Sequence, residues 1–159
     1  MITLYHGSNV AITEIDLEKG LPDKDFGKGF YLTDILEQAE GMAQRRTRIV
    51  GAGEPIVTAF AFDNLDIDMQ LKVKIFPDEP CEEWAAFVNA NRHSSETGFF
   101  HPYDVVIGPV ANDGVAYQLE RYNEGAIDLK TLTQELSYRK LNRQYFFGTK
   151  RTIEKLKRL

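Results

Sequence analysis

Ten residues near the N-terminus constrain this chain more than any other segment. Residues 25–34 read Asp-Phe-Gly-Lys-Gly-Phe-Tyr-Leu-Thr-Asp, and residues 5–8 read Tyr-His-Gly-Ser. Two glycines around one lysine, followed at once by an aromatic and aliphatic run, predict a tight loop that feeds a buried strand. We expect this loop to deliver Tyr31 to a fixed position, and we expect the chemistry of the protein to depend on these two segments.

The composition predicts a globular protein that does not enter a membrane. The chain has 159 residues, of which 43% are hydrophobic. A chain of this length fits one domain and buries roughly two thirds of its unfolded surface, so we expect a single domain over residues 1–159. No apolar run reaches the length of a membrane span, and the N-terminus lacks a basic segment followed by an apolar one. The single cysteine, Cys81, has no partner for an internal disulfide, which agrees with the cytoplasmic location that we expect.

Basic residues concentrate at the C-terminal end of an acidic chain. The net charge is -5, but residues 139–159 hold eight basic residues and one acid. This segment therefore carries +7, and the preceding 138 residues carry -12. A solvated basic helix face is the ordinary explanation of this pattern. A docking surface for an acidic partner or a phosphate backbone is the functional alternative.

Hydrophobic spacing and turn residues predict strands and helices in an interspersed order. The predicted strands are residues 2–6, 30–33, 56–62, 103–110 and 143–147. The predicted helices are one that starts at Asp34, followed by residues 82–92, 115–122, 129–141 and 149–159. Two segments are ambiguous: residues 12–17 form a short strand or an extended cover segment, and residues 66–76 add one or two short strands. Because strands return late in the chain, we predict a mixed α+β domain rather than a regular βαβ array.

Two of the predicted helices carry capping signals. Asp34 precedes Glu37 by three residues, and Thr131 precedes Gln134 by the same spacing. Pairs of this kind satisfy free backbone N–H groups at the first turn of a helix. We therefore predict a capping box at Asp34 and another at Thr131.

The sequence excludes several familiar kinds of site. Residues 27–29 are not a P-loop, because that motif needs a glycine five residues before the Gly-Lys pair and a Ser or Thr after it. His6 and Ser8 lack the Gly-x-Ser-x-Gly elbow of a hydrolase. Zinc-ligand spacing is absent from the histidines and the cysteine, which are His6, His93, His101 and Cys81. What remains is chemistry on a ligand held by a strand-edge histidine and an aromatic face.

The paired segments resemble the NAD-binding half of the diphtheria-toxin-like and poly-ADP-ribose-polymerase-like ADP-ribosyltransferases. The resemblance lies in Tyr-His-Gly-Ser at residues 5–8, in Phe-Gly-Lys-Gly-Phe-Tyr-Leu-Thr at residues 26–33, and in a following helix with Gln38 and Ala39. The whole chain, including the strand at residues 104–110, is further similar to a family of small bacterial proteins of this superfamily without settled function. The resemblance implies an ADP-ribosyltransferase-like fold, in which two small mixed sheets form an NAD cleft with flanking helices.

The resemblance also implies roles for individual residues toward NAD as co-substrate. His6 would hydrogen-bond the adenosine ribose, and the Gly7 backbone would pair with the nicotinamide carboxamide. Tyr31 would stack on the cationic nicotinamide ring. In the family a second aromatic residue usually lies eleven residues past that tyrosine, where this chain has Met42, whose thioether still contacts a ring favourably by about 0.3 to 1.5 kcal/mol. The same resemblance assigns three further residues to the NAD site: Ser8, Gly29 and Ala39.

The late strand carries the main departure from the family pattern. There the family has an acid that contacts the nicotinamide ribose and stabilises the oxocarbenium-like transition state, and the matching position here is Gln144. An amide donates to and accepts from a ribose hydroxyl, but it brings no charge and cannot act as a base. We therefore expect slow mono-ADP-ribosyl transfer without chain elongation, helped by the target or by another acid. Three acids are unranked candidates for that help: Glu37, Glu135 and Asp113.

Three functions fit these residues. The leading hypothesis is an NAD-dependent mono-ADP-ribosyltransferase that modifies a protein or nucleic acid, as the toxin of a toxin–antitoxin pair whose antitoxin covers the basic C-terminal segment. The second is a catalytically silent NAD or ADP-ribose binding module, marked by Met42 and Gln144. The third is an interaction domain that binds no nucleotide. Ordinary structural roles also fit: His6 as a strand-end residue, Tyr31 as core, Lys28 as an exposed loop residue and Gln144 as a polar residue of an edge strand.

Overall fold

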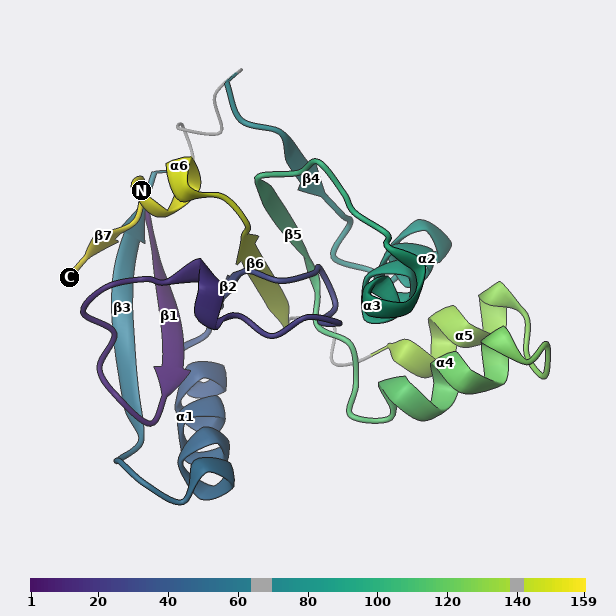
Figure 1. Ribbon diagram of the computed structural model, residues 1–159, viewed down its shortest axis with the longest axis horizontal. Helices are drawn as coiled ribbons and strands as arrows, with labels where there is room; N and C mark the ends of the chain where they lie inside the picture. The colour runs from purple at the N-terminus through teal and green to yellow at the C-terminus, as the bar shows by residue number, and fades with distance from the viewer. Residues whose placement is uncertain (64–69, 138–141) are drawn as a thin grey trace.

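The computed structural model describes residues 1–63, 70–137 and 142–159, which form an α+β fold (Figure 1). The strands are β1 (Ile2–Ser8), β2 (Phe30–Leu32), β3 (Ile56–Phe62), β4 (Val73–Ile75), β5 (Val105–Pro109), β6 (Arg143–Phe147) and β7 (Lys157–Arg158). The helices are α1 (Leu36–Val50), α2 (Glu82–Arg92), α3 (Ser94–Thr97), α4 (Val115–Asn123), α5 (Leu129–Leu136) and α6 (Lys150–Ile153), with a short 3-10 helix η1 at Leu17–Lys19. The predicted α+β class is confirmed.

The strands form two small sheets that are joined by a bridge. The first sheet has the order β1-β3-β7 and is antiparallel. The second has the order β2-β6-β5-β4 and is mixed, because β4 and β5 run parallel. Tyr5 of β1 and Thr33, which follows β2, exchange backbone hydrogen bonds of 2.7 and 3.0 Å. Figure 1 shows the first sheet and α1 on one side of the molecule, and α2 to α5 beyond the second sheet.

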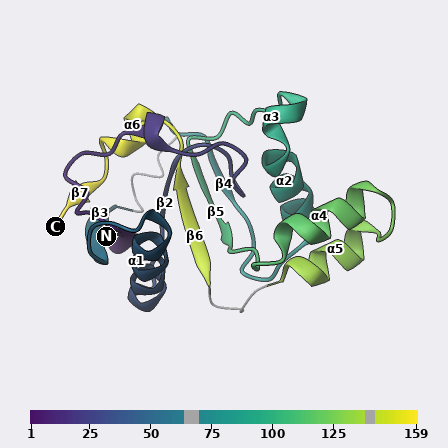
Figure 2. The ribbon, with the colours of Figure 1, turned by 60° about the horizontal axis from the view of Figure 1, so that its bottom comes forward.

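The second sheet has a hydrophobic core on each face, because successive side chains of a strand point to opposite faces. The inter-sheet core includes Leu4, Leu32, Phe60, Phe62, Val105, Ile107, Tyr145 and Phe147. The helix-side core includes Phe26, Trp84, Val88, Val106, Leu119, Leu132, Leu136 and Phe146. Figure 2 shows α2, α4 and α5 on the side of the second sheet that carries this helix-side core. Trp84 and Val88 of α2, and Leu132 and Leu136 of α5, recur at the spacing of one helical turn, so each helix buries one face.

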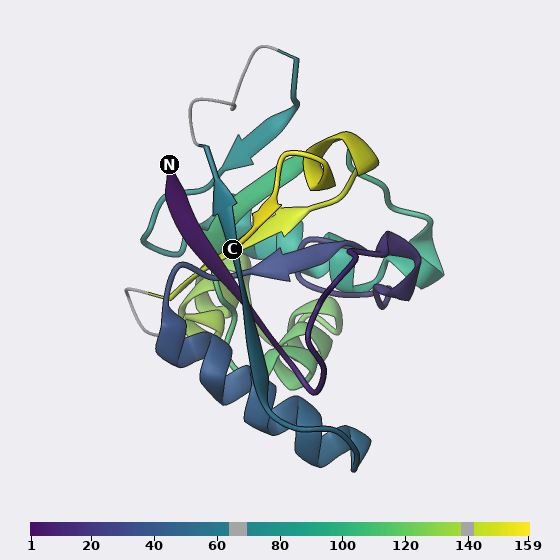
Figure 3. The ribbon, with the colours of Figure 1, turned by 90° about the vertical axis from the view of Figure 1, so that its left-hand side faces the viewer.

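Helix α1 packs against β1 at a very short distance. The residues that it buries there are Ala39 and Ala43, whose small side chains allow close approach. A Cβ atom at Gly7 would lie 1.9 Å from the carbonyl oxygen of Ala39 and 2.7 Å from the amide nitrogen of Ala43. Position 7 therefore requires glycine. Figure 3 shows α1 running beside the ends of β1 and β3.

Both predicted capping boxes are wrong. The N-cap residue of α1 is Ile35, and it makes no side-chain capping hydrogen bond. The Asp34 carboxylate instead accepts a hydrogen bond of 3.1 Å from the hydroxyl of Tyr145, so a tertiary partner in β6 draws it away from the helix. Helix α5 is capped by Asp128, whose side chain accepts from the Thr131 amide at 2.7 Å. A tertiary partner thus displaces the first predicted cap, and an earlier residue that begins the helix displaces the second.

The C-terminal end differs most from its prediction. The sequence predicts a basic helix over residues 149–159, but the structure has the short α6 followed by the strand β7. Sheet pairing overrides helix propensity here, because Arg158 pairs with Phe60 of β3 and the Leu159 amide donates to the Ala59 carbonyl at 3.0 Å. Leu156, which lies between α6 and β7, packs into the inter-sheet core and holds the segment in place.

The remaining predicted elements are confirmed, with small shifts at their ends. The strands predicted at residues 2–6, 30–33, 56–62, 103–110 and 143–147 correspond to β1, β2, β3, β5 and β6, and the helices at 82–92 and 115–122 correspond to α2 and α4. Residues 12–17 form no strand, but Ile12 and Ile15 cover the inter-sheet core. The helix predicted over 129–141 ends at Leu136, and its residues 138–141 lie outside the described residues. Residues 70–76 supply β4, whereas residues 64–69 also lie outside the described ranges. Within those ranges, no helix is long and apolar enough to cross a membrane.

Candidate functional site

The bridge between the sheets ends where a histidine side chain replaces a backbone partner. In a continued antiparallel ladder, the next pair of residues to exchange backbone hydrogen bonds after Tyr5 and Thr33 would be Gly7 and Tyr31. The Tyr31 carbonyl oxygen instead accepts a hydrogen bond of 2.8 Å from Nδ1 of His6. His6 therefore takes the acceptor that the ladder would assign to the amide of Gly7. β1 and β2 stop pairing at this point, with Gly7 on one strand edge and Tyr31 on the other.

The backbone of Gly7 faces away from its own sheet. In an antiparallel strand the N–H and C=O of one residue point to the same side, and every second residue points the same way. Tyr5 uses both groups toward β2, so the N–H and C=O of Gly7 also point toward β2. Outside the β1–β3 ladder, no hydrogen bond within the described ranges uses either group. A donor and an acceptor side by side suit a ligand carboxamide, which offers both an N–H and a C=O.

The His6 side chain is held as a neutral ring. Its imidazole stacks on Phe30, with ring centroids 4.5 Å apart. Burial lowers the pKa of His6 below its ordinary value, and the hydrogen bond to the Tyr31 carbonyl only partly offsets this effect. Because a carbonyl oxygen can only accept, Nδ1 carries the proton and Nε2 keeps a lone pair. Nε2 can therefore accept a hydrogen bond from a ligand hydroxyl.

Tyr31 packs against the helix-side core and holds the preceding loop. Its ring meets the Phe146 ring edge-on, with centroids 5.3 Å apart, and lies 6.5 Å from the Phe26 ring. Its hydroxyl donates to the Gly27 carbonyl at 2.6 Å and accepts from the Phe26 amide at 3.0 Å. Burial raises the pKa of Tyr31, so the hydroxyl stays protonated. Because Tyr31 and Gly7 would be opposite each other in the ladder, both lie on the same face of the bridged strands.

Gln144 also lies on this face, and its amide has a defined orientation. Phe146 is the residue of β6 opposite Tyr31, and Gln144 is two residues from Phe146. The Gln144 side-chain nitrogen donates to Oδ2 of Asp25 at 3.0 Å and to the Pro109 carbonyl at 3.3 Å. Both partners are acceptors, so the nitrogen is directed toward them and Oε1 is turned away. No hydrogen bond between described residues uses Oε1, which leaves an acceptor for a ligand.

The other residues assigned to NAD from the sequence have packing roles in the structure. Ala39 is buried where α1 crosses β1. Gly29 lets the loop cross β6, because a Cβ atom there would lie 2.3 Å from an aromatic ring of that strand. The nearly buried hydroxyl of Ser8 donates to Asn9 at 3.4 Å. Met42 is 53% exposed on α1 and is the residue of this group with most side-chain surface open to a ligand.

The candidate acids proposed from the sequence are all exposed. Glu37 lies in the first turn of α1, and Glu135 lies on α5. Asp113 precedes α4 and forms an ion pair of 3.6 Å with an arginine of α1. Lys28, which follows the first glycine of the loop, pairs with an exposed glutamate of η1 at 3.3 Å. The carboxylate that contacts the Gln144 amide belongs to none of these residues.

Asp25 is a residue of the site that the sequence reasoning missed. It is only 8% exposed, and its two carboxylate oxygens have different partners. Oδ1 accepts from Nε of Arg92 in α2 at 2.8 Å, and Oδ2 accepts from Gln144. The Phe26 carbonyl next to it accepts from Nε2 of His101 at 2.7 Å, so consecutive residues fasten this loop. An acid two residues before the Gly-Lys-Gly segment was a usable signal, but its partners lie far away in the sequence.

A family model described as "Protein of unknown function (DUF3990)" matches residues 2–158. The chain belongs to the DUF3990 family. No curated protein and no solved structure matches it. The function of this DUF3990 protein therefore has to be argued from the chemistry of its site.

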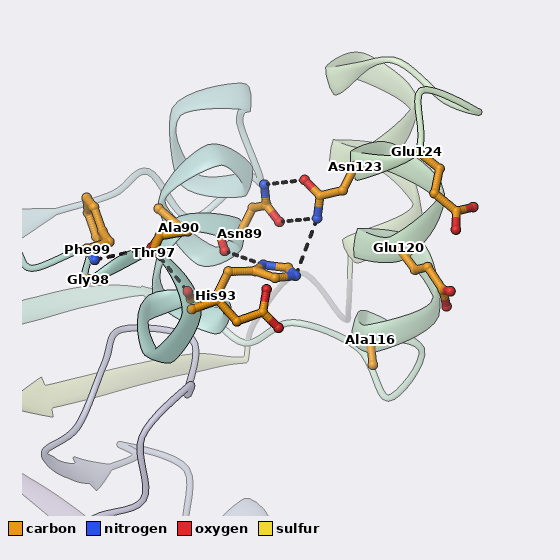
Figure 4. Close-up of a pocket in the computed structure, with 11 residues that line it drawn as sticks. Asn89, Ala90, His93, Thr97, Gly98, Phe99, Ala116, Glu120, Asn123 and Glu124 are labelled. Carbon is orange, nitrogen blue, oxygen red and sulfur yellow. Dashed lines mark hydrogen bonds between the residues drawn. The ribbon is translucent and has the colours of Figure 1, made fainter.

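Two depressions of the DUF3990 protein lie elsewhere than at the Gly7 edge. A depression of about 860 Å³ lies between α2, α3 and α4, where Asn89 and Asn123 exchange side-chain hydrogen bonds of 3.3 and 3.2 Å beside His93 (Figure 4). Another of about 210 Å³ lies beside the Gly-Lys-Gly loop. His6 and Gly7 line neither depression. Among the described residues, no group of three or more His, Cys, Asp or Glu side chains could hold a metal ion. We place the candidate site at the Gly7 edge on the basis of its hydrogen-bonding groups rather than of cavity size.

Proposed function

We propose that this DUF3990 protein binds NAD and transfers its ADP-ribose group to a macromolecular target. The observation that carries the proposal is the edge of β1, where the N–H and C=O of Gly7 point toward β2 without bonding a described residue there, beside the neutral ring of His6. The carboxamide of nicotinamide has the complementary donor and acceptor.

Three further side chains support the proposal. Nε2 of His6 is an acceptor suited to a ribose hydroxyl. Tyr31 supplies an aromatic ring on the same face as Gly7, and a cationic nicotinamide ring is attracted to an aromatic face. The side-chain oxygen of Gln144, which bonds no described residue, can accept from a second ribose hydroxyl. An ADP-ribosyltransferase-like fold is part of the same proposal, supported by the two bridged sheets that carry these residues on β1, β2 and β6.

The proposed reaction balances without a further reactant. The bond between C1′ of the ribose and the nicotinamide nitrogen breaks, and its electron pair goes to that nitrogen, so neutral nicotinamide leaves. A nucleophile of the target attacks C1′, forms the new bond and releases its proton to solvent. The residues of this chain bind and orient the reactants. The oxygen dipole of Gln144 stabilises developing positive charge less than a carboxylate would, so we expect slow turnover.

Nicotinamide release and label transfer test this proposal. Purified protein is incubated with NAD labelled in the adenine and with a cell lysate, and separate protease and nuclease digestions then identify the class of target. His6→Ala should lower kcat/KM for nicotinamide release at least about tenfold, because it removes a ring that both accepts from the substrate and separates β1 from β2. His93→Ala is the matched control, since that histidine lies on the far depression. Wild type that neither binds NAD nor releases nicotinamide would reject the function, and equal rates for the two variants would reject the site.

A catalytically silent NAD-binding module is the second candidate. It is favoured by Gln144, because an amide at this position brings no charge to the reaction. Calorimetry that shows NAD binding, together with wild type that releases no nicotinamide and Gln144→Glu that does, would establish it.

The acidic partner expected at the C-terminal segment stays a prediction, and β7 is where we expect it to bind. Arg143 and Arg151 already form ion pairs with aspartates of this chain, at 2.9 and 2.7 Å. Lys157 and Arg158 of β7 are exposed. An antitoxin of acidic surface would therefore contact β7 first. Charge reversal of Lys157 and Arg158 should abolish co-purification of such a protein, and its unchanged recovery would contradict this assignment.

A further inference from the structure

We propose that Asp25 is a positioning residue that orients and polarises Gln144, so that the pair acts where a single acid would otherwise be needed. This inference rests on the proposed function, because it concerns the same site and the same reaction. It names a residue outside the three acids that the sequence suggested. The juxtaposition that carries it is a nearly buried carboxylate 3.0 Å from the side-chain nitrogen of a strand amide whose oxygen bonds no described residue.

The neighbours of the Gln144 amide fix its orientation. A free glutamine side chain can turn its oxygen or its nitrogen toward a ligand. Gln144 cannot exchange them, because both neighbours of its nitrogen, the Asp25 carboxylate and the Pro109 carbonyl, are acceptors. Turning the amide over would place its oxygen against two other oxygens. Asp25 therefore keeps Oε1 directed away from the loop, where a ribose hydroxyl can donate to it.

The negative charge of Asp25 polarises the Gln144 amide. Hydrogen bonds to a carboxylate are roughly twice as strong as those between neutral groups, and linked hydrogen bonds polarise one another. A negative charge at the nitrogen end of the Gln144 amide increases the negative charge on Oε1. Arg92 binds the other carboxylate oxygen, so the ion pair presents its negative end to Gln144. The amide oxygen thereby gains part of the electrostatic effect of the carboxylate behind it.

The loop that carries Asp25 is held in place by the two residues that follow. Phe26 is fully buried in the helix-side core, and the Tyr31 hydroxyl bonds both its amide and the Gly27 carbonyl. Gly27 adopts a φ of 95°, which side chains other than glycine rarely allow. Asp25 thus reaches Gln144 from a backbone that is held at the next two residues. The ring that the resemblance assigns to nicotinamide also fixes the loop that carries the charge.

The test separates charge from shape. Asp25→Asn removes the charge and keeps the size of the side chain, and its single acceptor oxygen can serve Gln144 or Arg92 but not both. We expect kcat for nicotinamide release to fall about 10- to 100-fold, less than the 10²- to 10³-fold loss on removing a direct transition-state contact. The KM for NAD should change less than about twofold. Combining Asp25→Asn with Gln144→Glu returns one carboxylate to the pair and should restore kcat to the wild-type value or above.

Asp23→Asn is the matched control in the same loop. Asp23 accepts hydrogen bonds from the hydroxyl of Ser94 and the amide of Ser95, at 3.0 and 2.9 Å. Its φ of 59° is one that asparagine tolerates well. This variant removes one negative charge two residues from Asp25 and should leave kcat unchanged.

The outcomes distinguish this inference from the function on which it rests. Wild type without NAD binding or nicotinamide release would reject the proposed function and the inference with it. Active wild type together with an unchanged kcat for Asp25→Asn would overturn the inference alone. A loss of kcat in Asp25→Asn that the added Gln144→Glu does not restore would assign Asp25 a purely structural role in its loop. Loss in the single variant with recovery in the double variant supports the inference.

Discussion

Gly7→Ala tests the close crossing of β1 and α1. The added Cβ atom would lie 1.9 Å from the Ala39 carbonyl oxygen, 2.7 Å from the Ala43 amide nitrogen and 2.9 Å from the Ala39 carbonyl carbon. Ordinary contacts between such atoms are about 3.5 Å or longer. The neighbours are backbone atoms of a helix rather than the end of a flexible side chain. The whole of α1 would therefore have to move outward by more than about 1 Å.

The expected cost follows from this geometry. Overpacking of a well-packed interior costs about 1 to 3 kcal/mol, and the cost should lie at the upper end because a helix has to shift. For a protein of this size, each kcal/mol changes the melting temperature by about 2 to 4 °C, so Gly7→Ala should melt about 6 to 12 °C below wild type. Fluorescence of Trp84, which is fully buried and is the one tryptophan of the chain, reports unfolding in urea.

Gly41→Ala is the control for this prediction. Gly41 lies on the exposed side of the same helix, and a Cβ atom there would meet nothing within 4 Å. Replacing an exposed helical glycine by alanine stabilises a protein by about 0.5 to 1 kcal/mol. The two substitutions should therefore have opposite signs. A cost of less than about 0.5 kcal/mol for Gly7→Ala would refute the contact between α1 and β1 described above.

Three further predictions concern pH, an ion-pair network and the ligand site. Burial lowers the pKa of His6 and His101 below 6.5, so below that pH the unfolded chain binds more protons than the folded one. The free energy of unfolding should therefore fall as pH falls, by at most about 1.4 kcal/mol per pH unit for each histidine. Urea titrations at several pH values should show a smaller slope for His101→Gln, and an equal slope would contradict the argument. Asp104→Ala should lower the free energy of unfolding by about 2 to 3 kcal/mol, because the buried carboxylate accepts two hydrogen bonds from the half-exposed Arg151, at 3.0 and 2.7 Å. A loss below about 1 kcal/mol in thermal unfolding would be too small for that network. Met42→Tyr should tighten NAD binding several-fold in calorimetry, because a second aromatic ring adds about 0.5 to 1.5 kcal/mol, and unchanged affinity would argue against a nicotinamide position beside α1.

Local patterns in the sequence predict most of the regular elements. The apolar run of β5 is buried at every residue, as its continuous hydrophobicity indicates. β3 and β6 have the β-branched and aromatic residues that suit a pleated sheet. The errors occur where a distant partner competes with a local signal. Asp34 bonds the hydroxyl of Tyr145 instead of capping α1, and the basic C-terminal residues pair with β3 instead of continuing α6.

The residues of the candidate site also divide into those that local motifs select and those that only the tertiary structure brings together. His6, Gly7 and Tyr31 can be selected from two short motifs, because glycine positions and strand ends are local properties of the sequence. That the imidazole of His6 takes the carbonyl of Tyr31, and so leaves the Gly7 edge open, follows only from the way the two sheets meet. The acid that contacts Gln144, Asp25, is the clearest case. Glu37, Glu135 and Asp113 are reasonable choices by composition, but the structure brings none of them to that amide.

The α+β class, the interspersed order of strands and helices along the chain, and the two glycine-containing motifs can be read from the residues alone. These features depend on interactions over a few positions, which leave periodic patterns in a chain. The contact between Asp25 and Gln144 joins residues 119 positions apart. Its geometry depends on where two separate strands and a loop pack around shared cores, and no local pattern records that arrangement.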